Sequence, residues 1–235
     1  MKQINTASTN GISLSCTQGA PLATPALGRF PSNTATLVGD PGTSIYASVS
    51  YPAVFDKGDQ PDAFVTLDRS GRAVLRFRSD ALASDKPIDA DLRAVSMAAY
   101  PEYRPDQLVS ATVIFGNYRI AAQPNIWCYG YATGAVADGV SPCSIYVVLD
   151  KEINKPLKTF NLSLDNGARV AGAAPVASPE PGTTVYSIPF SSNGFGAADI
   201  VCDVPATVRG VVTLPDTNDG DIVVVKLMFL ARPGA

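Results

Sequence analysis

Proline and glycine interrupt nearly every long segment of this sequence, and this feature strongly restricts what the chain can fold into. The 235 residues include 19 Gly and 19 Pro. Proline breaks a helix from within, and both residue types favour tight turns. The apolar residues between these breaks come in short runs, which is typical of β-strands joined by turns. We therefore expect an all-β protein with at most one or two short helices.

Strand-like runs follow one another from residue 34 to residue 231. Turn signals at 68–71, 165–167 and 216–221 favour hairpins, and hairpins produce antiparallel sheets. The pattern predicts a single antiparallel β-sandwich domain of jelly-roll type over residues 34–235. The segment 89–99 is the one stretch whose loosely spaced apolar residues, bounded by prolines, predict a short helix.

Residues 1–33 differ from the rest because isolated apolar residues alternate with Ser, Thr, Asn, Gly and Pro. We interpret this segment as an extended N-terminal arm whose apolar residues contact a neighbouring subunit; the candidate contacts are Ile12, Leu14, Leu22 and Phe30. The segment lacks the continuous apolar stretch of a signal peptide, so we expect no secretion by that route. No run approaches the roughly 20 apolar residues of a membrane helix.

The chain contains no histidine. Serine or cysteine nucleophiles that need a histidine base are therefore excluded. Most aspartates lie in turn-forming segments, where a carboxylate is more often a backbone hydrogen-bond acceptor than half of a catalytic pair. No phosphate-binding loop or dinucleotide motif is present. We expect a protein that is not an enzyme and has no cofactor.

The cysteines Cys16, Cys128, Cys143 and Cys202 lie far apart, without the close spacing of zinc sites. We favour buried free thiols, with a disulfide between Cys128 and Cys143 as the alternative. The acidic segment 216–221 departs from the EF-hand spacing, so a hairpin turn is favoured over a calcium site. We thus expect no metal.

The segment 72–78 carries patterned charge. If this segment is a strand, one of its faces carries Arg72, Val74, Arg76 and Arg78. The opposite face carries Ala73, Leu75 and Phe77. The second face is predicted to be core. The arginine face is most simply a solvated surface; alternatively, it grips an acidic neighbouring subunit or nucleic acid. The net charge of −3 argues against non-specific binding of nucleic acid by the whole surface.

Aromatic residues offer a further candidate surface. Tyr100 and Tyr103 lie close together in sequence, and alternation places Trp127, Tyr129 and Tyr131 on one strand face. Such a stripe is more often core or interface, but an exposed one is an aromatic platform of the kind that binds sugars.

The charged fraction is only 17%, with few Lys and Glu, as in protein–protein interfaces. The leading hypothesis is a structural, assembly-forming protein: a virus or bacteriophage capsid protein, or a capsid-associated one. Such a protein would self-associate into a large homo-oligomer or shell, contact other virion proteins, and reside in the virion after assembly in the host cytoplasm. The first alternative is a carbohydrate-binding or adhesive β-sandwich module, and the second is a carboxylate-based hydrolase.

Overall fold

The computed structural model describes residues 6–9, 11–22, 31–79, 92–116, 121–122, 126–149, 157–176, 181–215 and 222–232. Strands dominate these residues, and every pairing between them is antiparallel except that of β12 (Ala135–Val136) with β19 (Ile222–Leu230). The only helical element there is the 3-10 turn η2 (Pro105–Gln107). No helix in these ranges is long and apolar enough to cross a membrane. The predicted all-β, antiparallel sandwich class is confirmed.

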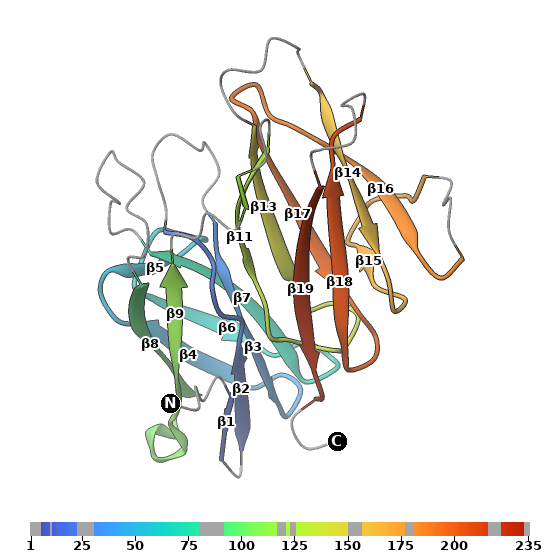
Figure 1. The fold of residues 1–235 in the computed structure, drawn as a ribbon. Helices are drawn as coiled ribbons and strands as arrows, with labels where there is room; N and C mark the ends of the chain where they lie inside the picture. The colour runs from blue at the N-terminus through green and yellow to red at the C-terminus, as the bar shows by residue number, and fades with distance from the viewer. Residues whose placement is uncertain are drawn as a thin grey trace.

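The first half of the chain forms two facing sheets around one core. Sheet I has the order β1 (Thr6–Ser8), β2 (Ile12–Cys16), β3 (Asn33–Gly39), β7 (Arg72–Ser79) and β5 (Ala53–Phe55). Sheet II has the order β6 (Asp62–Thr66), β4 (Ser44–Val49), β8 (Leu92–Pro101) and β9 (Val109–Gly116). We call this pair the first sandwich; it is drawn in blue to green in Figure 1.

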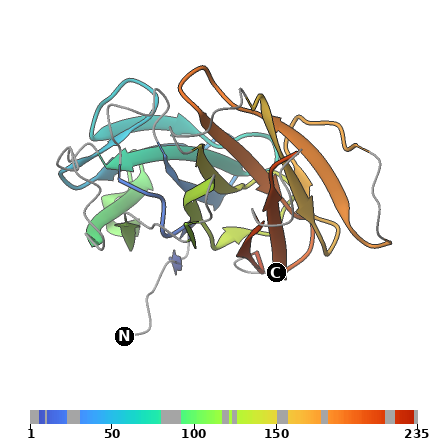
Figure 2. The ribbon, with the colours of Figure 1, turned by 45° about the horizontal axis from the view of Figure 1, so that its top comes forward.

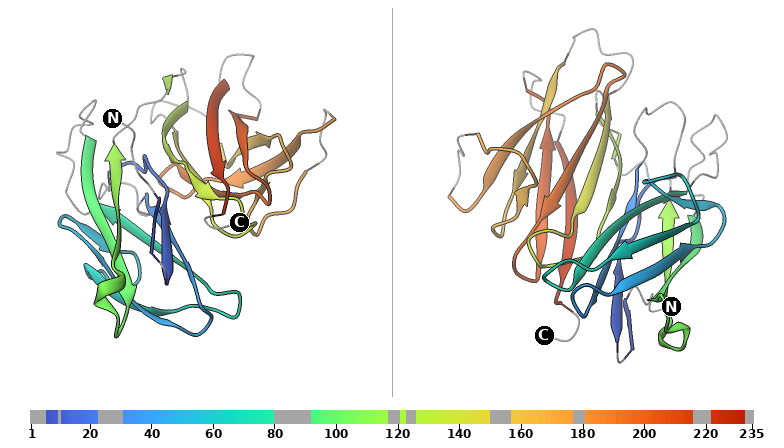
Figure 3. Two further views of the ribbon diagram at one scale, coloured as in Figure 1. Left: turned by 90° about the horizontal axis from the view of Figure 1, so that it is seen from below. Right: turned by 180° about the vertical axis from the view of Figure 1, so that it is seen from behind.

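The second half repeats the arrangement around a separate core. Sheet III has the order β10 (Ala121–Ala122), β11 (Ile126–Ala132), β13 (Cys143–Leu149), β17 (Phe195–Val201) and β15 (Arg169–Val170). Sheet IV has the order β12 (Ala135–Val136), β19 (Ile222–Leu230), β18 (Ala206–Thr213), β14 (Thr159–Leu164) and β16 (Thr184–Pro189). This second sandwich lies beside the first in all views (Figures 1, 2 and 3).

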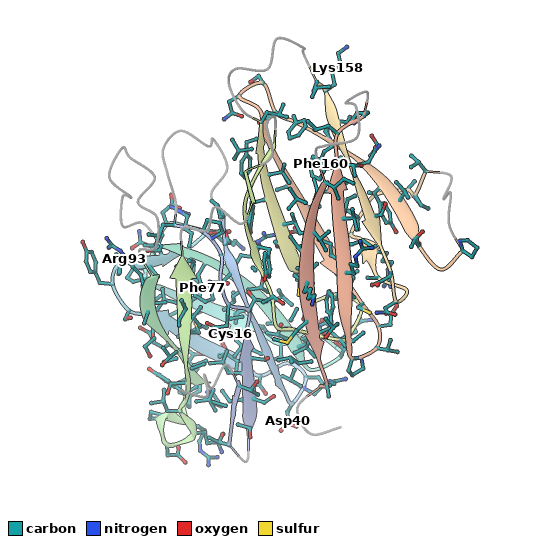
Figure 4. All side chains as sticks on the ribbon, viewed as in Figure 1. Cys16, Asp40, Phe77, Arg93, Lys158 and Phe160 are labelled. Atoms are coloured by element: carbon teal, nitrogen blue, oxygen red, sulfur yellow. The ribbon has the colours of Figure 1, made fainter. Side chains whose placement is uncertain are left out.

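Each core is filled by the apolar face of alternating strands. Phe77 and Cys16 are buried in the first core and Phe160 in the second, as their side chains in Figure 4 illustrate. In β7 the predicted register is correct, because Ala73 and Phe77 are core residues and Leu75 packs against them. The period-two pattern of the sequence therefore identified which face of this strand packs into the first core.

The N-terminal segment is extended, as expected, but it belongs to the first sandwich. β2 pairs with β3, with Leu14 opposite Leu37. Ile12, Leu14 and Leu22 are buried in the first core. Their side chains are therefore covered by residues of their own chain and are not exposed for contact with a neighbouring subunit. Phe30 lies outside the described residues.

The helix predicted over 89–99 is wrong; the described part of this segment belongs to strand β8. β8 pairs with β4 on one side and β9 on the other. Val95, Met97 and Ala99 are buried while Ser96 is exposed, which is a period of two rather than 3.6. Pairing on both sides satisfies the backbone of this segment and overrides its weak helical spacing.

Two of the three turn signals are correct locally, but these two turns join different layers. Asp68 Oδ1 accepts hydrogen bonds from the backbone N–H groups of Ser70 and Arg72 at 2.8 and 3.0 Å. This turn leads from β6 in sheet II to β7 in sheet I. The turn at 165–167 likewise leads from β14 in sheet IV to β15 in sheet III. The third segment, 216–221, connects the paired strands β18 and β19 but lies outside the described residues.

Candidate functional site

The arginine face of β7 lies against the second sandwich instead of facing solvent. Arg72 Nη1 donates to Asp138 Oδ2 at 2.7 Å, and Arg76 Nη1 donates to Asp199 Oδ2 at 2.6 Å. Burial alone would lower the pKa of Arg76, but the negative charge of Asp199 outweighs it and raises that pKa. The acidic residues that pair with these two arginines therefore belong to the same chain.

Arg78 completes the face within the first sandwich, where its Nη2 donates to Asp59 Oδ1 at 2.9 Å. Beside it, Tyr146 of β13 crosses the junction: its hydroxyl accepts from the N–H of Ser32 and donates to that residue's carbonyl, both at 3.0 Å. The expectation of a solvated arginine face is corrected, because Asp138, in the turn before β13, and Asp199 of β17 supply partners that the isolated strand lacks.

The aromatic stripe predicted from Trp127 to Tyr131 is interrupted. A bulge between Cys128 and Gly130 shifts the register, so that Trp127 is opposite Val148 and Tyr131 is opposite Ile145. Val148 and Ile145 are three positions apart on β13 and lie on opposite faces of it, so the simple alternation assumed for residues 127–131 does not continue through the bulge. Tyr131 packs against the second core, and the side chains of Trp127 and Tyr129 lie outside the described part.

The thiol chemistry matches the expectation where it is described. Cys143 and Cys202 are buried free thiols, which excludes the alternative disulfide between Cys128 and Cys143. Burial raises the pKa of Cys143 to about 12. A thiol with so high a pKa is not a nucleophile near neutral pH. Among the described residues no three His, Cys, Asp or Glu side chains gather as metal ligands.

Three described carboxyl groups have a clearly shifted pKa, and each shift is in the wrong direction for a general acid. The pKa values of Asp68, Asp106 and Asp138 are all lowered, chiefly by hydrogen bonds, although burial opposes the shift at Asp138. A general acid of a glycosidase needs a raised pKa instead. These groups are therefore structural hydrogen-bond acceptors.

The outer face of sheet II carries a different arrangement, a row of three aromatic side chains. Tyr46 of β4 is opposite Phe64 of β6 and, on its other side, Tyr100 of β8. The ring centroids of Tyr46 and Phe64 are 5.2 Å apart, and those of Tyr46 and Tyr100 are 5.1 Å apart. We call these three residues the aromatic row. It crosses three neighbouring strands, whose adjacency can be followed in Figure 1.

The aromatic row is exposed and held in place. Phe64 is 65% exposed because it points outward from an edge strand, while its neighbours Ala63 and Val65 pack toward the first core. Tyr46 and Tyr100 are half-buried. Cross-strand aromatic contacts restrict the rings, so the row presents apolar surface with little conformational entropy left to lose on binding.

Polar groups flank the aromatic row along both sides. The next row toward one end of the strands contains Asp62, Ser48, Ala98 and Ser110, each opposite the next across the sheet. Toward the other end, Ser44 is opposite Thr66 and its carbonyl accepts from the N–H of Glu102 at 2.9 Å. Hydroxyls and carboxylates therefore lie two residues along the strands from the aromatic rings, on either side of the row.

The electrostatics of the row centre on Tyr46. Burial raises the pKa of its phenol, and the negative charge of Asp62 and the neighbouring Tyr100 raise it further. The Tyr46 phenol is thus a neutral hydrogen-bond donor at physiological pH. Sequence reasoning noted Tyr100 but missed Tyr46 and Phe64. The available signal was that each stands at an outward position of an alternating strand.

A concavity lies on the outer face of sheet IV. It encloses about 310 Å³ and is lined by Ser163, Leu164, Asp165, Thr183, Arg209, Val211 and Ile222. Asp165 Oδ1 accepts from the backbone N–H of Arg209 at 2.7 Å, so part of its polar lining is already engaged. The lining has no aromatic ring. We therefore take the aromatic row as the candidate site.

Comparison with known proteins adds little beyond the architecture. No protein-family model matches the chain, and no curated protein matches it. Among solved structures, the D0-D1 domain of intimin is 15% identical, with 92% of this chain and 98% of that one covered and a TM-score of 0.31. The Salmonella enterica SafA pilin in complex with the SafB chaperone is 13% identical, with 94% and 99% covered and a TM-score of 0.29.

A β-glucuronidase from glycoside hydrolase family 2 is 12% identical, with a TM-score of 0.31; the match covers 94% of this chain but only 20% of the enzyme. Structures of intimin, of a pilin with its chaperone and of a glycoside hydrolase thus occur together among the similar structures. At these identities the likeness concerns β-sandwich architecture alone, and such low TM-scores give no weight to any one function.

Proposed function

We propose that this chain is a non-catalytic, adhesive β-sandwich module that binds a glycan on the aromatic row. The observation that carries the proposal is the row itself: Phe64, Tyr46 and Tyr100 side by side on an outer sheet face, between two rows of polar side chains. This reading takes up the alternative function expected from the sequence, at a different place from the Trp127 strand.

A sugar ring has an apolar face made of C–H groups and an edge made of hydroxyls. The aromatic row complements the face, since aromatic rings offer large apolar area at small entropic cost. The flanking residues, among them Ser48, Ser110 and Thr66, complement the edge with donors and acceptors. A glycan lying along the row would run across the strands, with its hydroxyls directed to both flanks.

The test is glycan binding by the chain with and without its most exposed ring. We expect Phe64→Ala to weaken binding about tenfold, because truncating an aromatic side chain that dominates a contact typically costs more than 1 kcal/mol and 1.4 kcal/mol is a factor of ten. Binding is measured by affinity electrophoresis and calorimetry with dextran, xylan, hydroxyethyl cellulose and soluble chitin oligomers.

The matched control is Met228→Ala. Met228 is 49% exposed on the outer face of sheet IV in the other sandwich, so its loss removes a similar apolar side chain away from the row. We expect Met228→Ala to bind as the parent does. If no glycan of the panel is retained, or if both variants lose affinity equally, the proposal is wrong.

A further inference from the structure

Two carboxylates flank the aromatic row, one on each side. Asp62 precedes Phe64 by two residues on β6, shares its outward face and is exposed. Glu102 follows β8, and its N–H donates to the carbonyl of Ser44, two residues before Tyr46. Alternation thus places a carboxylate beside the row at opposite ends of the strands.

Neither carboxylate forms an ion pair with any residue that the structure describes. Arg104, which closely follows Glu102, is engaged with Asp106, its Nε lying 3.2 Å from Oδ1. The field of Asp62 reaches the row, because its charge contributes to the raised pKa of Tyr46. The row therefore lies between two negative charges that no ion pair with a described residue neutralises.

These charges discriminate among glycans by simple electrostatics. A carboxylate accepts strong, charge-assisted hydrogen bonds from sugar hydroxyls. It attracts an ammonium group of an amino sugar and repels the carboxylate of a uronic acid or a sulfate ester. Because both flanks carry the same sign, a polyanionic chain lying along the row would meet repulsion on either side.

We infer that the aromatic row selects glycans without acidic groups, favouring amino-substituted over neutral chains, and that Asp62 and Glu102 impose this selection. The inference rests on the proposed function and adds the chemical class of the ligand. It assigns the carboxylates a role in specificity, not in catalysis.

The experiment compares glycans that share a backbone and differ in charge. The probes are dextran, dextran sulfate and diethylaminoethyl-dextran, together with hydroxyethyl cellulose and carboxymethyl cellulose, in affinity electrophoresis and calorimetry. We expect the neutral and cationic members to bind. The anionic members should bind about threefold to tenfold more weakly, which is the size of effect that a few exposed charges produce. The difference should shrink at high salt.

The variant that tests the assignment is Asp62→Asn combined with Glu102→Gln, which removes both charges and keeps the shapes. We expect it to lose the discrimination between neutral and anionic members while still binding the neutral ones. The control is Asp165→Asn in the second sandwich, which removes one charge far from the row but keeps the oxygen that accepts from Arg209. It should discriminate as the parent does.

The outcomes separate the two proposals. If neutral and anionic members bind equally, or if the double variant discriminates as well as the parent, the inference is overturned while glycan binding stands. If no member of any charge is retained, the proposed function fails and the inference fails with it.

Discussion

At the scale of single residues, aspartates carry much of the specific structure of this chain. Asp138 accepts hydrogen bonds from the N–H groups of Val140 and Ser141 at 2.9 and 2.7 Å, from the Ser141 hydroxyl, and from Arg72. Its carboxylate thereby organises a turn and ties it to the other sandwich. Burial by itself would raise the pKa of Asp138, but these bonds outweigh it and the pKa is lowered.

This lowered pKa predicts a specific acid sensitivity. The ionised Asp138 carboxylate stabilises the fold fully at pH values above its unfolded-state pKa of about 3.9. This stabilisation is lost as the pH falls through the lower pKa that Asp138 has in the folded state. We expect Asp138→Asn to cost about 1–3 kcal/mol at pH 7 and less in strong acid, measured by urea unfolding at several pH values. Asp106→Asn, in an exposed pair with Arg104, should change stability little. A cost at Asp138 independent of pH would contradict this account.

At the scale of elements, the position of β2 changes the meaning of the N-terminal segment. β2 lies between β1 and β3 in sheet I, and Leu14 and Cys16 are fully buried. An arm that contacts a second subunit could be removed without unfolding its own domain. A central strand of a sheet cannot, since its removal exposes both the core and the backbone of the neighbouring strand.

We therefore predict that deleting residues 1–16 unfolds the first sandwich. Leu14→Ala, a milder change, should cost about 2–5 kcal/mol. Leu108→Ala, at a position 51% exposed, is the control and should cost far less. Circular dichroism with urea unfolding measures stability, and light scattering measures mass. A truncated chain that stays folded but loses mass would instead support the predicted self-association into a shell, which stays a prediction.

At the scale of the whole molecule, the two cores are separate except that Ala132 of β11 packs into the first, and polar contacts across the junction join the two sandwiches. Arg76 and Asp199 form a bidentate pair, and the Ser144 hydroxyl donates to the same carboxylate at 2.7 Å. Thr36 and Ser141 hydroxyls lie 2.8 Å apart across the junction. Partly buried contacts of this kind fix orientation, because breaking one leaves its partner unsatisfied.

This junction predicts that the two sandwiches unfold together. The division expected from the sequence, an arm over 1–33 and one domain over 34–235, stays a prediction that calorimetry addresses. We expect a single transition for the parent and a broadened or double transition for Arg76→Ala, because loss of the pair uncouples the halves. Arg169→Ala, which removes an exposed pair with Asp203 inside the second sandwich, is the control. Two transitions in the parent would contradict the coupling.

The sequence by itself determined the local properties of this protein: the all-β class, the buried face of β7, the turn at 68–71 and the exclusion of histidine chemistry. These depend on alternation and turn-forming residues, which act over a few positions. Only the tertiary structure decided which strands are neighbours. It placed Tyr46, Phe64 and Tyr100 in one row, gave Arg76 its acidic partner, and put β2 inside a sheet. Strand pairing joins residues far apart in sequence, and one bulge between Cys128 and Gly130 shifts a register that alternation alone does not predict.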